Sequence, residues 1–499
     1  MLNWLLALLS AALLVLAFPG FHITYLAPIA LAPLLLAAAR EMRPRRRFLL
    51  GWAAGTAYWF GVCYWIEYTL AIYGGLGSLA GWAVFCLFAV TKGLHLAFFT
   101  LLAGILMRHW WAVPAVAALW VAVEATHGFL GFQWLTLGNA GIDMGIPLRL
   151  APITGVWGIS FVFAMMATAL ALALLRRSRL ELLWLLLLPF LAYLPPLPAA
   201  LRGRDQALLV QPNISESEQF TEESLYRTAN RLADLTERSV RIESSKPPSL
   251  VLWPEVPAPF YYYDDNGFRQ IIDNLARTID ANLVIGVVAH TDSGRPLNSA
   301  VLISRAGVPI SRYDKVNLVP FGEFVPWPFG FANKISTEVG DFAAGRRVVV
   351  SPVDGHKIGG FICYESVFPN FVRQFAASGA EVLYNISNDG WFGKTAAREQ
   401  HLTIVRMRAA ENRRWILRSA NDGITGTIDP AGRVRGTLPL FTEATSYTGF
   451  TYIADQTFYT RHGDWFPLLC AAFAVLALGG EFLLRRLNFA AAGLLVLSR

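Results

Sequence analysis

The chain has 499 residues, of which 55% are hydrophobic and only 15% are charged, so we expect a membrane protein and not an average soluble one. Its formal net charge of +7 comes from 42 Lys plus Arg against 35 Asp plus Glu. The arginines cluster at the ends of apolar runs, a pattern that indicates membrane topology and argues against nucleic-acid binding.

The apolar residues divide the chain into three parts. Residues 1–200 are nearly continuous apolar runs, residues 201–460 resemble an ordinary globular sequence, and residues 461–499 hold one more apolar run. A transmembrane helix needs roughly 20 apolar residues. We therefore predict an eight-span α-helical membrane bundle from the segments 3–18, 22–39, 48–72, 78–107, 110–130, 151–175, 180–197 and 466–484.

Arginine clusters follow every second predicted span, so every such cluster falls on one side of the membrane. By the positive-inside rule that side is the cytoplasm. We therefore expect both termini in the cytoplasm of a bacterium and residues 201–460 on the periplasmic face of its inner membrane. The residues concerned are Arg40, Arg43, Arg45, Arg46, Arg47, Arg108, Arg176, Arg177, Arg179, Arg485 and Arg486.

Several ionisable residues lie inside the predicted spans. Such groups are functional candidates by default, although pairing between neighbouring helices is an equally simple explanation. The sequence leaves their roles open. They are Glu67, Lys92, His95, Glu124 and His127.

The globular segment alternates β-rich runs with amphipathic helices, a pattern typical of a layered α/β domain. Helices are expected at about 216–243, 267–280, 366–378 and 397–413, and strands at 207–210, 249–253, 282–289, 299–304, 347–353, 357–363, 381–387 and 414–420. No Gly-rich phosphate loop follows a strand, and no His/Cys cluster has metal-ligand spacing. We therefore expect neither a nucleotide cofactor nor a metal.

Cys363 is the only cysteine of the globular segment. It follows a buried-strand pattern at 358–362 and precedes the predicted helix at 366–378, so it should lie on a strand-to-helix turn. The N–H groups and positive dipole end of that helix would favour a thiolate. The alternative is a buried, inert cysteine. The remaining cysteines lie in apolar runs, at Cys63, Cys86 and Cys470.

Three charged residues stand near predicted strand ends in the same way. Glu255 follows the strand 249–253, and Lys315 and Glu323 lie in the segment YDKVNLVPFGEF. Loops at strand ends are where α/β domains assemble their sites. Taken singly, each residue has an ordinary alternative, such as a turn cap, a solvated lysine or a salt bridge.

Together these residue types suit a thiol nucleophile. Glu255 would remove the proton of Cys363 and later return it. Lys315 would stabilise the thiolate and, with the backbone N–H of Tyr364, the tetrahedral oxyanion. The set therefore favours acyl transfer through a thioester.

The stretches VLWPE, YDKVNLVPFGEF and ICYES, in this order, resemble the Glu-Lys-Cys signature of the nitrilase, or carbon–nitrogen hydrolase, superfamily. A nitrilase-like domain between seven preceding spans and one following span is similar to the bacterial apolipoprotein N-acyltransferases. Further similar stretches are LVQPNI (209–214), NDGWFG (388–393), QH (400–401) and RAAENRRWILRSANDGITG (408–426). The resemblance covers nearly the whole chain.

This resemblance implies an αββα sandwich and a ping-pong reaction. An acyl chain passes from a phospholipid, such as phosphatidylethanolamine, to Cys363. It then passes to the α-amine of the diacylglyceryl cysteine that begins an apolipoprotein. By the same resemblance Glu255, Lys315 and Cys363 form the triad, Glu323 is a second glutamate, and the residues beside the nucleophile are Tyr364 and Glu365. Three positions depart from the family's frequent residues, namely Phe220, Ala397 and Trp415.

The loops around the candidate site are unusually aromatic. In an outer domain tethered to a bilayer at both ends, such residues either contact lipid and exclude water or belong to the core. We expect lipid contact, with packing in the core as the alternative. The residues are Phe220, Trp253, Phe321, Phe324, Trp327, Trp391 and Phe392.

Two other functions remain open from the residues alone. A membrane-tethered amidase or nitrilase would give the acyl group to water. A transporter or scaffold would use the outer domain only for binding, as Glu67, Lys92 and Glu124 suggest.

Overall fold

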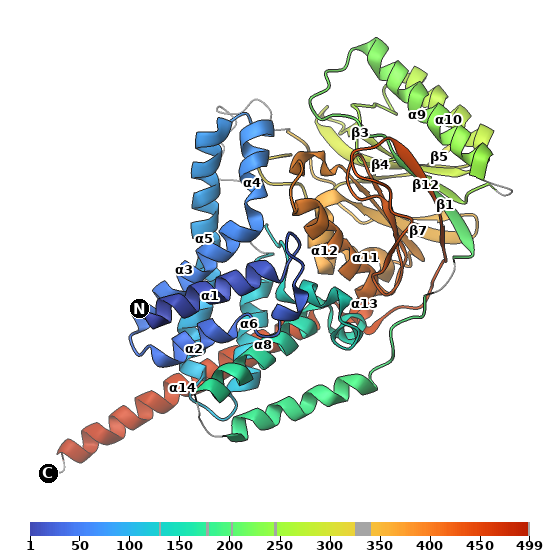
Figure 1. Ribbon diagram of the computed structural model, residues 1–499. Helices are drawn as coiled ribbons and strands as arrows, with labels where there is room; N and C mark the ends of the chain where they lie inside the picture. Colours follow the sequence, from blue (N-terminus) through green and yellow to red (C-terminus); the bar gives the residue numbers. More distant parts are fainter. Residues whose placement is uncertain (129–130, 176–178, 201–202, 244–246, 325–340, 498–499) are drawn as a thin grey trace. The chain divides into compact units, whose positions relative to one another are not determined.

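The computed structural model of the protein describes residues 1–128, 131–175, 179–200, 203–243, 247–324 and 341–497 (Figure 1). Contacts divide the chain into two compact units. The first comprises Met1–Tyr64, Ala83–Pro195 and Asp464–Arg499, and the second comprises Trp65–Trp82 and Pro196–Gly463. The second unit thus includes a segment that the sequence placed in the membrane bundle.

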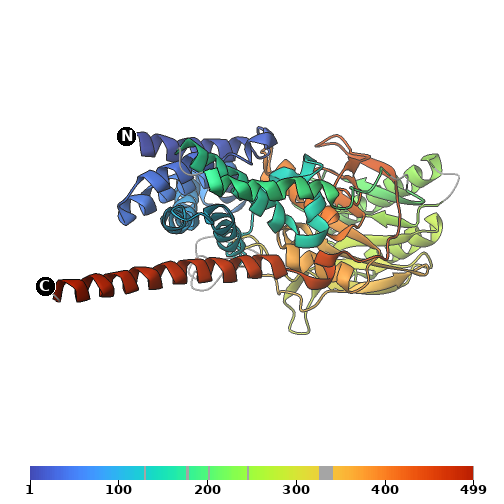
Figure 2. The same ribbon diagram turned by 90° about the horizontal axis from the view of Figure 1, so that it is seen from below.

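The first unit is helical. Its α1 packs against α2 and α3, and its α6 packs against α8 and α14. Small residues let two of the helices approach closely, because a Cβ atom at Gly51 would collide with the Leu96 carbonyl. The main helices are α1 (Leu2–Leu16), α2 (Ala32–Arg40), α3 (Pro44–Cys63), α5 (Gly77–Leu106), α6 (Ala112–Ala125), α8 (Val156–Leu174) and α14 (Trp465–Leu497), which Figure 2 shows as one unbroken helix.

Three of the described helices are long and apolar enough to cross a membrane, namely Gly77–Leu106, Val156–Leu174 and Trp465–Leu483. Within the second predicted span the chain forms the short 3₁₀ helix η1 (Thr24–Leu26) and begins the nine-residue helix α2, which is about 14 Å long against a hydrocarbon core of about 30 Å. The seventh predicted span forms the 3₁₀ helix η5 (Arg179–Tyr193), with Pro189 inside it. A membrane protein with several apolar helices is confirmed, whereas the count of eight spans stays a prediction.

The second unit is built on two six-stranded sheets. The first sheet has the order β12-β1-β2-β3-β4-β5 and the second has the order β11-β10-β9-β8-β7-β6. The strands of the first sheet are β1 (Asp205–Gln211), β2 (Leu250–Leu252), β3 (Asn282–His290), β4 (Pro296–Ile303), β5 (Pro309–Asp314) and β12 (Ala444–Phe450). Those of the second are β6 (Val350–Val353), β7 (His356–Ile362), β8 (Val382–Ser387), β9 (Ile416–Ala420), β10 (Gly426–Ile428) and β11 (Val434–Arg435).

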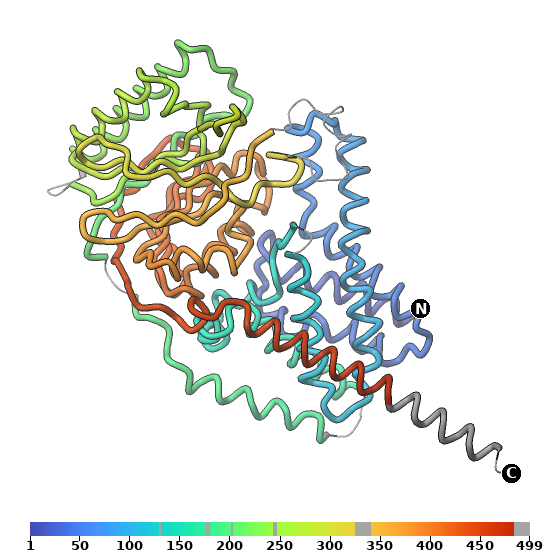
Figure 3. The backbone as a smooth tube through the Cα atoms, turned by 180° about the vertical axis from the view of Figure 1, so that it is seen from behind, coloured from blue at the N-terminus to red at the C-terminus, as the bar shows by residue number. Residues whose placement is uncertain are grey.

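The two sheets stack with helices outside them (Figures 1 and 3). Alternation along β1 shows the layering, because Leu208 and Val210 pack towards α9 (Glu222–Glu243) and α10 (Asn266–Ile279), whereas Leu209 joins a core shared with the second sheet. On the second sheet, α11 (Pro369–Ala377) packs against β7 and β8, and α12 (Ala397–Asn412) lies beside α11. The predicted α/β sandwich is confirmed.

Each strand and helix predicted for the globular segment has a counterpart, but β5, β10, β11 and β12 were missed. The strand β5 lies at the edge of the first sheet, and its sequence PISRYD has no run of apolar residues. Edge strands carry polar side chains because one side meets solvent, so their apolar signal is weak. This miss matters, because β5 carries Lys315 at its end.

Residues Trp65–Trp82 pack against the turn at Asp389–Phe392. The hydroxyl of Thr69 donates to the Trp391 carbonyl at 3.0 Å, and that of Tyr73 donates to the Gly390 carbonyl at 3.3 Å. The rings of Trp65 and Phe392 meet edge to face, 5.0 Å apart. The predicted span 48–72 therefore ends as a helix at Cys63, and the chain continues into a short helix, α4 (Trp65–Tyr68), and a π-helical turn, η2 (Thr69–Tyr73).

Gly286 of β3 makes room for the bend that carries Glu255. A Cβ atom at this position would lie 2.8 Å from the Glu255 Cα and would collide with the Pro254 carbonyl. We expect Gly286→Ala to cost about 1–3 kcal/mol of folding free energy by overpacking and to displace Glu255. We expect a Tm at least about 2 °C lower and a slower reaction at the Cys363 site.

Gly145→Ala is the matched control, because a Cβ atom at Gly145 would have no neighbour within 4 Å. A Gly286→Ala protein with unchanged Tm and activity would show that the bend does not depend on this close approach.

Candidate active site

Loops after three strands bring Glu255, Lys315 and Cys363 together. Glu255 follows β2, Lys315 follows β5 and Cys363 follows β7. The Lys315 ammonium donates to Glu255 Oε1 at 2.9 Å, and the two residues are only 1% and 5% exposed. Both charges are close enough to Cys363 to shift the pKa of its thiol. The predicted juxtaposition is therefore present in the fold.

A second carboxylate and an amide complete the surroundings of Lys315. The ammonium also donates to Glu323 Oε1 at 3.0 Å. Asn298, on β4, bridges the two carboxylates, donating to Glu255 at 2.7 Å and to Glu323 at 2.8 Å. Burial by itself would lower the pKa of Lys315, but the charges of Glu255 and Glu323 outweigh it and raise that pKa. The lysine is therefore held as a cation.

Cys363 lies on the predicted strand-to-helix turn, between β7 and α11. It begins a five-residue 3₁₀ turn, η7 (Cys363–Val367), and its φ of 48° is left-handed, a conformation that a non-glycine residue adopts only at a cost of about 1–3 kcal/mol. This backbone conformation sets the direction of the Cys363 side chain. Such strain is typical of functional turns.

The resting thiol differs from the expected thiolate. Burial raises the pKa of Cys363 well above its ordinary value, and Glu255 raises it further, whereas Lys315 acts in the opposite direction. The N–H of Ile362, at the start of the turn, is moreover bound to the Glu365 carboxylate at 2.8 Å. The N-terminus of a long helix does not stabilise a thiolate at Cys363. The sulfur therefore stays protonated until a base removes its proton.

Glu365 connects the Cys363 turn to the Lys315 loop. Its fully buried carboxylate accepts from the N–H of Ile362 and from the N–H groups of Val316 and Asn317, at 2.7–3.0 Å. The Tyr313 hydroxyl donates to it as well, at 2.7 Å. Burial raises the pKa of Glu365 to about 7. This residue therefore positions the two loops and is not placed as an oxyanion donor.

Tyr364 sits directly after the nucleophile, within the same turn. Its ring is buried and meets the ring of Phe368 edge to face, 5.5 Å apart. The side chain thus packs the base of the turn. Stabilisation of the oxyanion by the backbone N–H of Tyr364 stays a prediction.

A buried polar cluster supports the turn from the far side, and the sequence did not predict it. Asp389 binds His401 Nδ1 at 3.0 Å and Arg418 at 2.7 Å, and His401 Nε2 lies 3.1 Å from the Cys363 carbonyl oxygen. Burial would raise the pKa of Asp389, but Arg418 and His401 lower it, so the carboxylate is charged. The stretches NDGWFG and QH contain two of these residues, but only the fold brings them beneath Cys363.

The same cluster has residue types that can bind a metal. Ligand atoms of Cys363, Asp389 and His401 lie within 4.8 Å of one another. The His401 and Asp389 side chains, however, already bind each other, Arg418 and the Cys363 carbonyl. We interpret this cluster as a hydrogen-bonded support for the Cys363 turn.

The aromatic residues expected to contact lipid fall into two groups. Trp253 is 1% exposed and donates to the Thr236 hydroxyl at 3.1 Å, so it belongs to the core, which corrects the expectation of lipid contact for this residue. Phe220 is partly buried and packs against the same core, and its contact with lipid stays a prediction. Phe321 and Trp391 are exposed, at 41% and 43%, and Phe324 and Phe392 are partly exposed. Trp327 lies outside the described residues.

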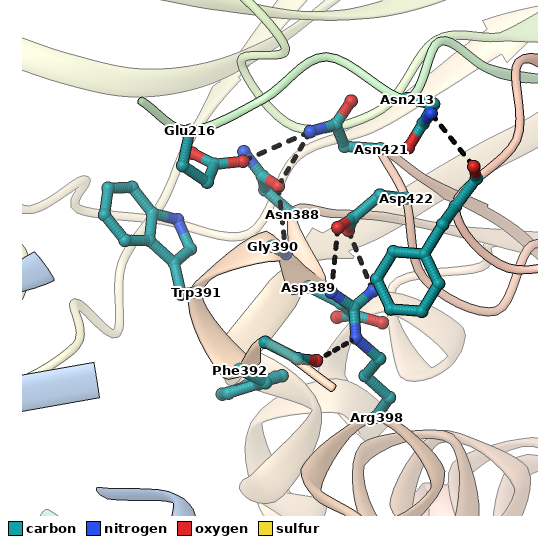
Figure 4. A network of polar contacts seen from close by, with 12 residues as sticks. Asn213, Glu216, Asn388, Asp389, Gly390, Trp391, Phe392, Arg398, Asn421 and Asp422 are labelled. Atoms are coloured by element: carbon teal, nitrogen blue, oxygen red, sulfur yellow. Dashed lines mark hydrogen bonds and ion pairs between the residues drawn. The ribbon is translucent and has the colours of Figure 1, made fainter. Parts of the chain in front are cut away.

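Residues around the turn at Asp389–Phe392 form a further polar network (Figure 4). The backbone N–H of Asn388 donates to Glu255 Oε2 at 2.8 Å, and the Asn388 side chain accepts from Asn421 at 3.2 Å. Arg398 pairs with both oxygens of Asp422, at 2.9 and 2.8 Å. The network ties the second carboxylate oxygen of the triad to the loops at the ends of β8 and β9.

Two family models match separate parts of the chain. Residues 199–452 match the carbon-nitrogen hydrolase family, and residues 10–169 match the apolipoprotein N-acyltransferase N-terminal domain. The chain is 34% identical to an apolipoprotein N-acyltransferase from Geobacter metallireducens, over 95% of this chain and 94% of the relative. It is 35% identical to one from Azotobacter vinelandii, over 98% and 96%. Among solved structures, an amidase from Nesterenkonia sp. is similar to 53% of this chain and 95% of its own, with 18% identity and a TM-score of 0.39.

The role of Glu365 can be tested by Glu365→Gln. The amide would place an N–H₂ donor where a carboxylate oxygen now accepts, leaving at least one buried N–H without an acceptor. We expect a loss of about 1–3 kcal/mol in unfolding free energy and a loss of activity, since the Lys315 loop is no longer fixed to the Cys363 turn. Thermal unfolding and acyl transfer measure the two effects. Glu223→Gln, on the exposed face of α9, should change neither.

Proposed function

Because this chain belongs to the apolipoprotein N-acyltransferase family, we propose that Glu255, Lys315 and Cys363 are the groups that perform its acyl transfer. The chain is an apolipoprotein N-acyltransferase by its similarity over nearly its full length. The observation that carries the assignment of residues is the buried Lys315–Glu255 ion pair beside the Cys363 thiol. Its acceptor is a lipoprotein and its donor carries an acyl chain.

In the first half-reaction the donor is a phospholipid, such as phosphatidylethanolamine. Glu255 takes the proton of the Cys363 thiol, and the sulfur attacks the ester carbonyl carbon. The oxyanion that forms is stabilised by the Lys315 ammonium and the backbone N–H of Tyr364. When the intermediate collapses, the C–O bond breaks, Glu255 returns the proton to the leaving alcohol, and a lysophospholipid departs.

The second half-reaction transfers the chain from Cys363 to the acceptor. The α-amine of the diacylglyceryl cysteine attacks the thioester carbonyl, and the same donors stabilise the oxyanion. The C–S bond then breaks, an amide forms, and the thiol is restored. This sequence needs no cofactor.

Lys315 must remain charged through both half-reactions, and its neighbours explain how it does. The ammonium donates to Glu323 as well as to Glu255, and Asn298 donates to both carboxylates, so a proton can move to and from Glu255 while a second carboxylate still balances the lysine. We assign Glu323 this positioning role. Its bond to the Val319 N–H, at 2.8 Å, also ties down the loop that carries it.

Exposed aromatic residues near the site suit a lipid donor. Phe321 and Trp391 are exposed and belong to the loops that carry Glu323 and Asn388. Contact between these rings and an acyl chain would keep water from the thioester, which water would otherwise hydrolyse. We propose that these loops face the outer leaflet, with the catalytic unit in the periplasm of a bacterium and both chain ends in the cytoplasm.

The reaction can be tested with purified full-length protein, phosphatidylethanolamine and a diacylated lipopeptide. We expect triacylated peptide and lysophospholipid in equal amounts. Cys363→Ser, Glu255→Gln and Lys315→Met should each lower the rate by at least about 100-fold, since each removes a group needed for the thioester. Cys86→Ser, which removes the exposed cysteine of α5, is the control. Free fatty acid as the main product would favour the hydrolase, and an active Cys363→Ser protein would favour a binding role.

The charge of Lys315 can be tested separately from turnover. A thiol reacts with an alkylating agent as its thiolate, and Lys315 lowers the pKa of Cys363. We therefore expect Lys315→Met to slow the alkylation of Cys363 at a fixed pH, measured by mass spectrometry in a Cys86→Ser background. An unchanged rate would remove the electrostatic role given to the lysine.

A further inference from the structure

Glu216 lies next to the triad but takes no part in the two half-reactions. It stands in the loop after β1 and is partly exposed, in contrast to Glu255. Its Oε1 accepts from the Asn421 side chain at 3.1 Å (Figure 4). A hydrogen bond also joins its carboxyl to the Asn388 side chain. Since the Asn388 N–H binds Glu255, a single residue separates the two carboxyl groups.

The other carboxyl groups around the site already have a function in the fold. Glu255 and Glu323 share Lys315, Asp389 binds Arg418, Asp422 binds Arg398, and Glu365 is fully buried among its four donors. Glu216 differs from all of these. Among the residues that the structure describes, no Lys, Arg or His lies within ion-pair distance of its carboxyl, and only neutral amides bind it.

The surroundings of Glu216 make it a proton acceptor near neutral pH. Burial raises the pKa of Glu216 to about 7, and the negative charges of Asp422 and Glu255 add to this, while its bonds to Asn388 and Asn421 oppose it. Tyr73 is the other ionisable group whose charge interacts with it. A cation that approached the carboxyl would be attracted by Glu216 and by its two acidic neighbours.

We propose that Glu216 binds the primary ammonium group of the acceptor and takes its proton before the amine attacks the acyl-enzyme. An α-ammonium has a pKa of about 8, so most of it is protonated, and unreactive, at pH 7. A partly exposed carboxylate that one residue, Asn388, separates from Glu255 is placed both to hold that charge and to remove the proton. The inference rests on the proposed function, because it requires an acyl group on Cys363.

The protons balance in this scheme. Glu216 carboxylate and the ammonium become carboxylic acid and neutral amine. The amine nitrogen then forms the amide bond as the C–S bond breaks, and its second proton passes through Glu255 to the Cys363 sulfur. Glu216 releases its proton to solvent, so each turnover yields one amide, one thiol and one proton.

Two molecules could supply a primary ammonium group, the acceptor's α-amine and the ethanolamine headgroup of the donor. They act in different half-reactions, so the reaction can be divided to tell them apart. Without an acceptor, release of lysophospholipid reports the first step with phosphatidylethanolamine or with phosphatidylglycerol, which has no ammonium. Addition of a diacylated lipopeptide to the preformed acyl-enzyme reports the second step.

The test is Glu216→Gln in the full-length protein, because glutamine keeps the shape of the side chain and removes its charge. At pH 7 we expect the second step to slow by about tenfold or more, while the first step stays within about twofold of wild type for both donors. Glu218→Gln is the matched control, since Glu218 is an exposed glutamate of the same loop. It should change neither step.

The pH profile separates proton transfer from a structural effect. In the wild-type protein the second step should rise with pH through about 7, as Glu216 ionises, and then level off. In Glu216→Gln it should rise only through about 8, as the amine loses its proton unaided, so that the defect shrinks to less than about twofold at pH 9.

Three results would overturn the inference. They are an unchanged second step, an equal loss in both steps, and a loss confined to the first step with phosphatidylethanolamine, which would assign the ammonium to the donor. A failure of the proposed function looks different, because the wild-type protein would then form no acyl-enzyme at all.

Discussion

The buried ammonium of Lys315 is the constraint on which the catalytic unit depends. Removing an ammonium from water costs several kcal/mol unless opposite charges surround it, and the carboxylates of Glu255 and Glu323 do so here. They come from the loop after β2 and the loop after β5, and the Asn298 amide on strand β4 donates to both. Lys315 and its two carboxylates therefore join segments of the first sheet, and the charge of Lys315 also lowers the pKa of the Cys363 thiol.

The nucleophile depends on a second set of buried polar contacts. Cys363 has a left-handed backbone, which is costly and persists because the surrounding structure determines it. Glu365 accepts hydrogen bonds from the Cys363 turn and from the Lys315 loop, and His401 contacts the Cys363 carbonyl. Because burial raises the pKa of Cys363, the proposed mechanism needs Glu255 to accept the proton of the thiol.

The catalytic unit also uses residues from the apolar half of the sequence. Thr69 and Tyr73 bind the carbonyls of Trp391 and Gly390, and Trp65 packs on Phe392. The same turn begins after Asn388, whose N–H binds Glu255 and whose side chain binds Glu216. A segment that follows the third helix thus supports a loop of the active site. Residues Trp65–Trp82 therefore belong to the catalytic unit, although they lie in the apolar half of the sequence.

The sequence by itself determined the division into apolar and globular parts, the α/β alternation, and the location of Cys363, Glu255 and Lys315 at element ends, because hydrophobic periodicity and motif order are local properties. It missed the edge strand β5, because a polar edge strand carries little periodic signal. It also missed that Trp65–Trp82 belongs to the second unit, because an aromatic turn carries little periodic signal. Only the tertiary structure decided the roles of Asn298, Asp389, His401, Arg418 and Glu216. Asp389, His401 and Arg418 lie in the family-like stretches NDGWFG, QH and RAAENRRWILRSANDGITG, but the sequence does not show which residues they bind. The partners of all five residues lie elsewhere in the chain, so their burial and pairing are decided only when the chain has folded.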